Sequence, residues 1–337
     1  MGTRCLHHTG IQFILLLVCL PGLYAAQARF RPLPGRRNTR ESKACVAKGR
    51  ISSPAFNASL SEPAFSTVAL NLRPCILVRT YKGNRNGLVS LLWSLLSSGH
   101  PNLRAIVVDT DPEPLPGLGK IVDSVNALSG RPWVNVSPRT HAQDVDGKFS
   151  SLGTPDYGYV LTDLVMEDIL KGNGNRNGSV STEVDLIGTA AASAQPCDTL
   201  TVTNGDNVYA QQFLVRTLNK IAKGADIVGT NWVSHYDIDA PPRGTSFFYR
   251  GDWCGPYRGG GFQEMKVRFQ VGCIDLGAAV FRLKPIQEWG LRFYVDDLRA
   301  NKTVDHLEMS DGRFLELLAR LPGVSFAVLH EALFIHN

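Results

Sequence analysis

The chain has 337 residues, of which 44% are hydrophobic and 19% are charged, a composition typical of a globular protein with one large domain or two small ones. The formal net charge is +5, but residues 29–50 hold eight Lys or Arg and a single Glu and so carry +7. Subtracting that segment and Arg4 leaves a net charge of −3 for the rest of the chain. The folded part is therefore not basic, and we predict no nucleic-acid partner.

The first 28 residues have the layout of a secretory signal peptide. Arg4 precedes the apolar run IQFILLLVCLPGLYAA, residues 11–26, and a small-residue A-Q-A sequence closes the segment. A type II membrane anchor is the alternative, but a spanning helix needs roughly 20 apolar residues and this run is shorter. We therefore predict a signal peptide over residues 1–28 and favour it over an N-terminal membrane anchor. The rest of the chain would then lie in the lumen of the secretory pathway, in the Golgi or ER, or outside the cell.

Residues 29–73 are predicted to be a disordered stem, because they combine positive charge with proline. N-glycosylation sequons that fit a secretory compartment begin at Asn57, Asn135, Asn177 and Asn301. The cysteines beyond the signal peptide are Cys45, Cys75, Cys197, Cys254 and Cys273. We expect one or two disulfides in an oxidising compartment, with Cys254–Cys273 as one candidate, and no zinc site, because no C-x-x-C spacing occurs.

An α/β fold is predicted from the alternation of strand and helix patterns. Residues 74–81 (PCILVRTY) form a short apolar strand, residues 88–99 an apolar helix closed by glycine, and residues 104–108 a second strand. A strand, a helix and a strand in this order make a βαβ unit, whose strands are parallel. Residues 115–156 carry few such patterns and are expected to be mostly loop.

The second half continues the alternation around the turn NGDN, residues 204–207. Its predicted elements are a helix at 160–170, a strand at 198–203 and a strand at 225–233. Apolar residues at helical spacing follow NGDN, so the turn joins a strand to a helix and the hairpin interpretation weakens. Two roles stay open: Asp206 or Asn207 is the N-cap of that helix, or Asp206 holds a metal at the end of a strand.

Polar residues follow each of three predicted strands: Arg79-Thr80-Tyr81, Asp109-Thr110-Asp111 and Asn204-Gly205-Asp206. Ligand sites of open parallel sheets form where the carboxyl ends of strands meet their loops. We therefore expect these residues to gather along one edge of the sheet, a placement that favours the metal-binding role of the turn.

Several stretches, taken in order, resemble the GT-A glycosyltransferases, in particular the inverting family-2 type. They are the opening that leads through PNL to VVDTDP, the motif TVTNGDNVY, the later strand VGCIDLGAAVFRL and the terminal ALFIHN. The resemblance covers residues 74–337. It implies a single catalytic domain with a GT-A-like, mostly parallel but mixed sheet flanked by helices, and a nucleotide-diphosphate sugar as the donor.

The resemblance also implies a metal site. TNGDN is similar to the D-x-D-type motif that holds a divalent metal on the donor's diphosphate, which makes Asp206 a metal ligand. His336 in the terminal segment is the implied second ligand, with His330 as its rival. Mn²⁺ or Mg²⁺ is the expected cation, because such ions favour oxygen ligands and leave positions open for phosphate. The chain departs from the motif at Asn204, which is left with a weaker contact to ribose or metal-bound water.

The donor nucleotide is expected to lie against several strand ends. Asp109 matches the acidic strand end that contacts the nucleotide base in this family, and Thr80, Tyr81 and Asn204 lie at neighbouring ends. Asp163, in GYVLTDL, matches a helix start from which similar enzymes approach the donor. From the sequence alone Asp163 is equally a solvent-facing helix residue.

The catalytic base is predicted to be Asp311, in DHLEMSDGRFLELL. An inverting transfer needs one carboxylate to take the proton from the acceptor hydroxyl. Glu308 and Asp305 are the alternates. The competing structural interpretation makes Ser310 or Asp311 the N-cap of a helix over residues 313–320.

The predicted function is that of a metal-dependent glycosyltransferase of the secretory pathway, with a nucleotide-sugar donor and a hydroxyl acceptor on a glycan, protein or lipid. A secreted carbohydrate-binding or catalytically inactive transferase-like protein is the alternative, favoured by the amide at Asn204. A nucleotidyltransferase would normally carry a glycine-rich basic loop for a triphosphate, and KGNRNG matches such a loop poorly.

Overall fold

The computed structural model describes residues 63–81, 85–112, 115–144, 158–174, 196–234, 263–271, 273–293 and 310–336, all within one compact unit, Leu60–Asn337. Outside these ranges lie the predicted signal peptide, residues 29–62 of the predicted stem, and Asn57, Asn177, Asn301, Cys45, Cys254, Asp305 and Glu308. Within them, no helix has the length and apolar character needed to cross a membrane.

Helices and strands alternate through the described chain, as the α/β prediction requires. The helices are α2 Thr67–Asn71, α3 Arg85–Leu96, α4 Leu118–Ser129, α5 His141–Asp144, α6 Tyr159–Gly174, α7 Phe213–Ala222, the 3₁₀ turn η4 Leu276–Ala278, α8 Leu283–Trp289 and α11 Ser310–Arg320. The strands are β1 Pro74–Thr80, β2 Arg104–Asp109, β3 Val134–Val136, β4 Thr199–Asn204, β5 Val208–Tyr209, β6 Ile227–Ser234, β7 Gln263–Met265, β8 Ala279–Arg282 and β9 Phe326–His336.

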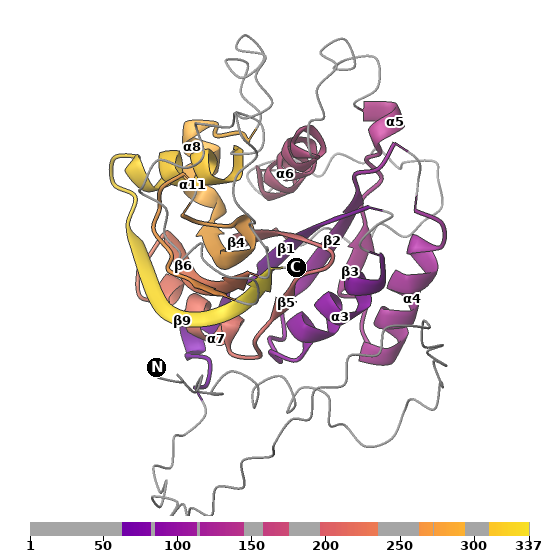
Figure 1. The fold of residues 1–337 in the computed structure, drawn as a ribbon, viewed down its shortest axis with the longest axis horizontal. Helices are drawn as coiled ribbons and strands as arrows, with labels where there is room; N and C mark the ends of the chain where they lie inside the picture. Colours follow the sequence, from indigo (N-terminus) through magenta and orange to yellow (C-terminus); the bar gives the residue numbers. More distant parts are fainter. Residues whose placement is uncertain are drawn as a thin grey trace, which may run out of the picture. The chain divides into compact units, whose positions relative to one another are not determined.

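One mixed sheet runs through the described residues in the order β3-β2-β1-β4-β8-β6-β9-β5, with β7 paired to β6 (Figure 1). Strands β3, β2, β1 and β4 are parallel neighbours, and β6 is parallel to β9. Strand β8 runs antiparallel between β4 and β6, and β5 is antiparallel to β9. Most paired residues belong to parallel neighbours, so the predicted mixed, mostly parallel sheet is confirmed.

Helices cover both faces of this sheet. Figure 1 shows α3, α4 and α7 on one side, and α6, α8 and α11 on the other. The central strands β1 and β4 are buried on both faces, as expected of strands between two helical layers, although β4 (TLTVTN) alternates threonine with apolar residues. Helix α7 shows why such helices form: its apolar residues recur at helical spacing and bury Phe213, Leu214, Leu218 and Ile221 against the sheet.

A covalent and an ionic contact tie β1 to the entrance of β4. Cys75 and Cys197 form a disulfide across a sequence separation of 122 residues, with Cα atoms 5.7 Å apart. Beside it, the guanidinium of Arg73 donates to both carboxylate oxygens of Asp198, at 3.0 and 2.6 Å. Cys273 is also disulfide-bonded, and its pairing with Cys254 stays a prediction because Cys254 lies outside the described residues.

Two boundaries differ from those expected from the sequence. Helix α2 lies within residues assigned to the stem, where Ala69 is fully buried, so ordered structure begins before Pro74. The supposed loop 115–156 contains α4, β3 and α5. Helix α4 was missed because glycines bound it on both sides: Gly117 and Gly130 each have positive φ, and their loop signals mask a helix of modest length.

Candidate active site

The carboxyl ends of the parallel strands meet at one edge, as the sequence predicted. In the register of the sheet, Thr80 pairs with Asp109 and Arg79 with Asn204. The amide of Gly205 donates to the carbonyl of Arg79 at 2.8 Å, which fixes the NGDN turn to the end of β1. The structure therefore brings these strand ends together.

The NGDN turn is not a helix cap. Helix α7 begins at Phe213, well beyond Asp206, and its N-cap residue is Gln212. The short strand β5 follows the turn instead, and pairs with β9 rather than with β4. Inside the turn, the amide of Asn207 donates to the carbonyl of Asn204 at 3.3 Å. The N-cap interpretation is wrong, because the chain uses the residues after the turn to build a strand.

Helix α3 supports this turn at very close range. A Cβ atom on Gly87 would lie 2.5 Å from the Cα of Asp206 and 3.0 Å from the carbonyl oxygen of Gly205. Only glycine permits this approach, because the atoms that a side chain would strike are mostly backbone. The helix thereby holds Asp206 at the edge of the sheet.

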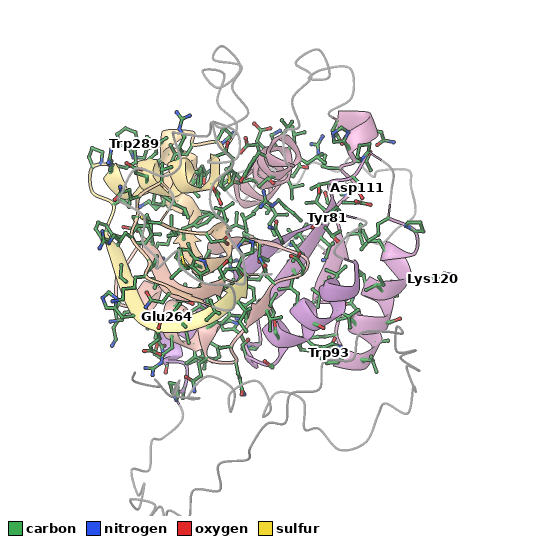
Figure 2. The ribbon with its side chains drawn as sticks, viewed as in Figure 1. Tyr81, Trp93, Asp111, Lys120, Glu264 and Trp289 are labelled. Atoms are coloured by element: carbon green, nitrogen blue, oxygen red, sulfur yellow. A yellow bond between two sulfur atoms is a disulfide. The ribbon has the colours of Figure 1, made fainter. Side chains whose placement is uncertain are left out.

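Tyr81 lies beside two carboxylates at this edge. Its side chain is 43% exposed, and burial of its remainder, together with the negative charges of Asp206 and Asp111, raises the pKa of the phenol. Figure 2 shows Tyr81 and Asp111 next to each other, where β1 and β2 end. An exposed ring beside carboxylates suits the stacking of a planar ligand group near a bound cation.

His336 ends β9 and lies next to the turn. Because Val208 pairs with Ile335 in antiparallel register, the residues just before Val208 lie beside the end of β9. The Nδ1 atom of His336 lies 3.2 Å from Oδ2 of Asp275, and the other oxygen of Asp275 accepts from the amide of Gly277 at 2.7 Å. The rival His330 is exposed and further from this strand end.

Close packing fixes η4, and hence Asp275, against β9. The hydroxyl of Tyr209 donates to the carbonyl of Gly277 at 2.9 Å. A Cβ atom on Gly277 would lie 2.5 Å from the ring of Phe334, so the ring occupies the space of a side chain. These contacts place Asp275 beside His336. The acid in GCIDLG was the sequence signal that could have pointed to Asp275.

The donor set at this edge fits a divalent cation. Asp206 supplies a carboxylate, and a histidine whose Nδ1 faces a carboxylate can ligate through Nε2. Within the described part of the chain, no group of three or more His, Cys, Asp or Glu side chains is arranged to hold a metal ion. A cation held by Asp206 and His336 would keep positions open for phosphate oxygens, as Mn²⁺ and Mg²⁺ allow.

Asp311 lies in the first turn of α11 as a partly buried carboxylate. Burial and the negative charge of Asp275 raise its pKa to about 7, against the opposing effects of the Gly312 amide and the positive charge of Arg79. Oδ1 of Asp311 accepts from that amide at 2.7 Å. Helix α11 already begins at Ser310, so Asp311 lies inside the helix and is not its N-cap. A carboxylate with such a pKa suits a general base.

Arg79 and Tyr159 complete this cluster, although neither was predicted to have a role in it. Nε of Arg79 donates to Oδ1 of Asn204 at 3.1 Å, and its guanidinium carbon lies 4.9 Å from the centre of the Tyr159 ring. Burial and the charge of Asp311 raise the pKa of Tyr159. The loss of the motif's first acid at Asn204 was the signal that could have pointed to Arg79.

Thr80, Asp109 and Asp163, which were predicted to bind the donor nucleotide, each form hydrogen bonds within the protein. Thr80 is fully buried, and its carbonyl accepts from the amide of Thr110 at 2.8 Å. Asp109 accepts from the amides that follow it, at Asp111 (3.2 Å) and Leu115. Asp163 accepts from the amide of Phe293 at 2.8 Å, which joins α6 to the segment after α8. Asp109 shapes the loop at the site, and Asp163 is buried rather than solvent-facing and ties α6 to Phe293.

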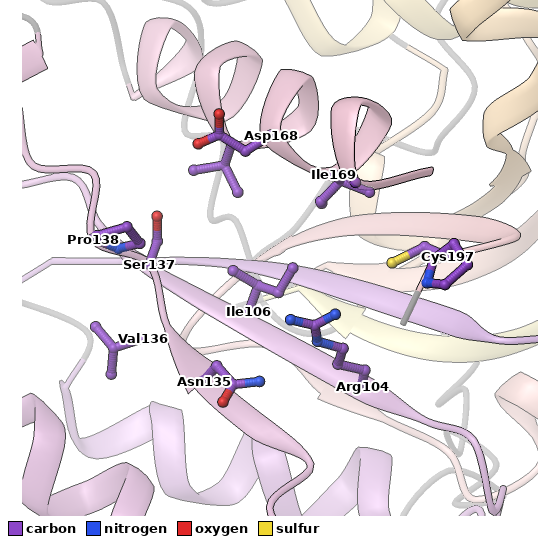
Figure 3. Close-up of a pocket in the computed structure, with 12 residues that line it drawn as sticks. Arg104, Ile106, Asn135, Val136, Ser137, Pro138, Asp168, Ile169 and Cys197 are labelled. Carbon is purple, nitrogen blue, oxygen red and sulfur yellow. The ribbon is translucent and has the colours of Figure 1, made fainter. Parts of the chain in front are cut away.

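A separate cavity of about 180 Å³ lies beneath α6, along β2 and β3 (Figure 3). Arg104 and Ile106 of β2 line it from one side, and Asp168 and Ile169 of α6 from the other. It contains none of the predicted site residues. Pockets that hold drug-sized ligands measure roughly 300–1,000 Å³, so this cavity is small for a nucleotide sugar.

No protein-family model matches this chain, and no curated protein matches it either. Among solved structures, S. aureus TarS residues 1–349 aligns with 79% of this chain and 60% of its own, at 11% identity and a TM-score of 0.43. The same fragment with UDP-GlcNAc aligns with 79% of this chain and 58% of its own, at 12% identity and a TM-score of 0.42.

The mannosyltransferase PcManGT from Pyrobaculum calidifontis, solved with GDP-Man and Mn²⁺, aligns with 78% of this chain and 56% of its own. Its identity is 10% and its TM-score 0.42. This chain therefore spans less than two thirds of either solved chain. Similarities this distant do not establish a function. Evidence for the function therefore has to come from the residues of the site.

Proposed function

We propose that this protein is a metal-dependent glycosyltransferase that moves a sugar from a nucleoside-diphosphate sugar to a hydroxyl acceptor. One observation carries the proposal: Asp206, the Asp275–His336 pair and Asp311, a carboxylate with a pKa near 7, converge at the carboxyl edge of an α/β sheet. This is the edge at which such sheets bind ligands. The same edge supplies a place for a cation and a base for a hydroxyl.

The donor is expected to lie across the ends of β1, β2 and β4. A cation at Asp206 and His336 would stabilise the negative charge that grows on a departing diphosphate. Tyr81, beside Asp111 and Asp206, offers its exposed ring to the nucleoside end of the donor. The family-2 assignment and inversion of configuration belong to this proposal.

Asp311 acts as the base in the proposed transfer. Its carboxylate takes the proton of the acceptor hydroxyl while the acceptor oxygen forms a bond to the anomeric carbon. The bond from that carbon to the diphosphate oxygen breaks, and the electron pair leaves with the diphosphate. Attack from the side opposite to the leaving group inverts the anomeric carbon. A pKa of about 7 leaves Asp311 ionised in a useful fraction near neutral pH.

We further propose a secretory-pathway location, in the Golgi, the ER or outside the cell, with an acceptor on a glycan, a protein or a lipid. The Cys75–Cys197 disulfide supports an oxidising compartment. The proposed signal peptide over residues 1–28, in place of a membrane anchor, would deliver the chain there.

Calorimetric titration of the full chain with UDP, GDP and their sugars, with and without Mn²⁺, tests the proposal. We expect one nucleotide to bind in a Mn²⁺-dependent manner and Asp206→Ala to remove that dependence. Asp123→Ala, an exposed acid on α4, is the matched control and should bind normally. Failure of every nucleotide to bind in the presence of Mn²⁺ would reject the proposal. Binding without slow donor hydrolysis would favour the carbohydrate-binding alternative.

A further inference from the structure

Arg79 forms a hydrogen bond to Asn204, the position at which the chain departs from the D-x-D-type motif. It is the next-to-last residue of β1 and pairs with Asn204 across the parallel ladder, so both side chains lie on the same face of the sheet. Nε donates to Oδ1 of Asn204 at 3.1 Å, and the ring of Tyr159 lies 4.9 Å from the guanidinium carbon. The guanidinium is therefore fixed between a strand end and α6.

At least one N–H donor of this guanidinium forms no hydrogen bond with the described residues. Arginine has five N–H donors in a planar fork. Nη1 of Arg79 is shielded from solvent and has no hydrogen-bond partner among the described residues. None of the ion pairs between described residues includes Arg79. An unfilled buried donor is costly and calls for a ligand or another specific explanation.

An oxyanion is the ligand that this geometry selects. The fork of a guanidinium matches the oxygens of a phosphate or carboxylate. The side chain is partly exposed as a whole although Nη1 is shielded, so a phosphate oxygen has to reach the guanidinium from its exposed part. Its partner Asn204 belongs to the turn that carries Asp206, where a metal-bound diphosphate would lie. We propose that Arg79 binds a phosphate oxygen of the donor's diphosphate. This inference rests on the proposed function, which brings a diphosphate to this edge.

The amide at Asn204 then has a physical reason. An aspartate at this position would accept the same hydrogen bond from Arg79 as an ion pair and neutralise the guanidinium. The amide oxygen of Asn204 holds the guanidinium in place without neutralising it, so its positive charge can act on a bound diphosphate as well as on Asp311. A preorganised charge of this kind stabilises the negative charge on a leaving diphosphate. Asn204 replaces the first acid of the motif, and the neighbouring guanidinium of Arg79 would bind the same diphosphate.

Calorimetric titration of the full chain with inorganic pyrophosphate, in EDTA, isolates the contribution of Arg79 from that of the metal. We expect Arg79→Gln to weaken pyrophosphate binding roughly 10- to 100-fold, the loss of one or two charge-assisted hydrogen bonds. Arg79→Lys should fall in between, because it keeps the charge without the fork. Arg104→Gln is the matched control, a partly buried arginine of β2 in the cavity under α6, and should bind as wild type does. Thermal unfolding of each variant confirms that it is folded.

Asn204→Asp gives the opposing test. It restores the acid of the motif, yet in EDTA we expect it to bind pyrophosphate about 10-fold more weakly, because the new carboxylate neutralises Arg79. Equal or tighter pyrophosphate binding by this variant overturns the inference, as does wild-type affinity in Arg79→Gln. In either case nucleotide binding by the wild type with Mn²⁺ leaves the proposed function standing. Absence of all nucleotide binding by the wild type rejects both.

Discussion

Nδ1 of His336 lies 3.2 Å from Oδ2 of Asp275, although the two residues come from different elements, the end of β9 and the turn before η4. A carboxylate oxygen only accepts, so the proton of a neutral imidazole lies on Nδ1 and the lone pair on Nε2. Carboxylates that orient histidines in this way are common around metal ligands. If His336 binds the proposed cation, Asp275 would orient it for that role.

Asp275→Asn should weaken Mn²⁺ binding roughly 10- to 100-fold, the usual cost of losing such a supporting contact. An amide at this position can turn its NH₂ group toward Nδ1, which favours the tautomer with its proton on Nε2. Titration of Mn²⁺ followed by electron paramagnetic resonance measures the affinity without any need for activity.

His330→Asn is the control for this prediction, because His330 lies on the same strand and is exposed. It should bind Mn²⁺ as the wild type does. If Asp275→Asn left the Mn²⁺ affinity unchanged while His336→Asn abolished binding, the supporting role of Asp275 would be wrong.

Asp311→Asn should lower kcat at least roughly 100-fold while making the protein more stable at alkaline pH. Because its pKa is raised from 3.8 to about 7, the folded state binds this proton more tightly than the unfolded state does. Wild-type stability therefore falls as the pH rises from about 4 to 7, and the loss persists above that range. The variant removes this loss, so we expect a gain of about 1–3 kcal/mol at pH 8 and almost none at pH 4.

Chemical denaturation of both proteins at the two pH values measures this difference. Equal stability at pH 8 would mean that Asp311 is not held above its ordinary pKa. Once an acceptor is found, kcat/KM of the wild type should rise with pH around a midpoint near 7, because the ionised form is the base.

Gly87→Ala should disturb the NGDN turn, because α3 packs directly against it. The added methyl would lie 2.5 Å from the Cα of Asp206, so α3 or the turn has to move. We expect a loss of about 1–3 kcal/mol in the free energy of unfolding, together with weaker Mn²⁺ binding. Urea denaturation and Mn²⁺ titration measure the two effects.

Gly119→Ala is the matched control, since Gly119 lies in helix α4 and a Cβ there meets nothing within 4 Å. Alanine is the better helix former, so this variant should gain up to about 1 kcal/mol and bind Mn²⁺ normally. Similar behaviour of the two variants would contradict the close contact between α3 and the turn.

Replacing Cys75 and Cys197 by alanine should lower the free energy of unfolding by about 2–4 kcal/mol. The disulfide closes a loop across 122 residues, so its loss frees a long stretch of the unfolded chain. Urea denaturation measures the change, and treatment of the wild type with a reductant should lower its stability at least as much. An unchanged midpoint in the double variant would show that the disulfide does not contribute.

The sequence by itself determined the main strands and helices and the edge where the site lies. Strands β1 and β2 contain continuous apolar runs, β4 (TLTVTN) is rich in β-branched residues, and α7 is a strongly amphipathic helix, so local composition and periodicity decide their type. Parallel strands then place their carboxyl ends together, so the sequence alone is enough to assign Asp109, Asn204 and Asp206 to one edge.

Only the tertiary structure decided which side chains face one another there. The Arg79–Asn204 hydrogen bond joins residues 125 positions apart, and the Asp275–His336 pair joins η4 to β9. Such pairs depend on the order and register of strands, which local patterns do not encode. The pKa of Asp311 depends on burial and on the charge of Asp275, and both arise only when the chain packs. Local sequence therefore determined where the polar residues gather, and packing decided their partners and charges.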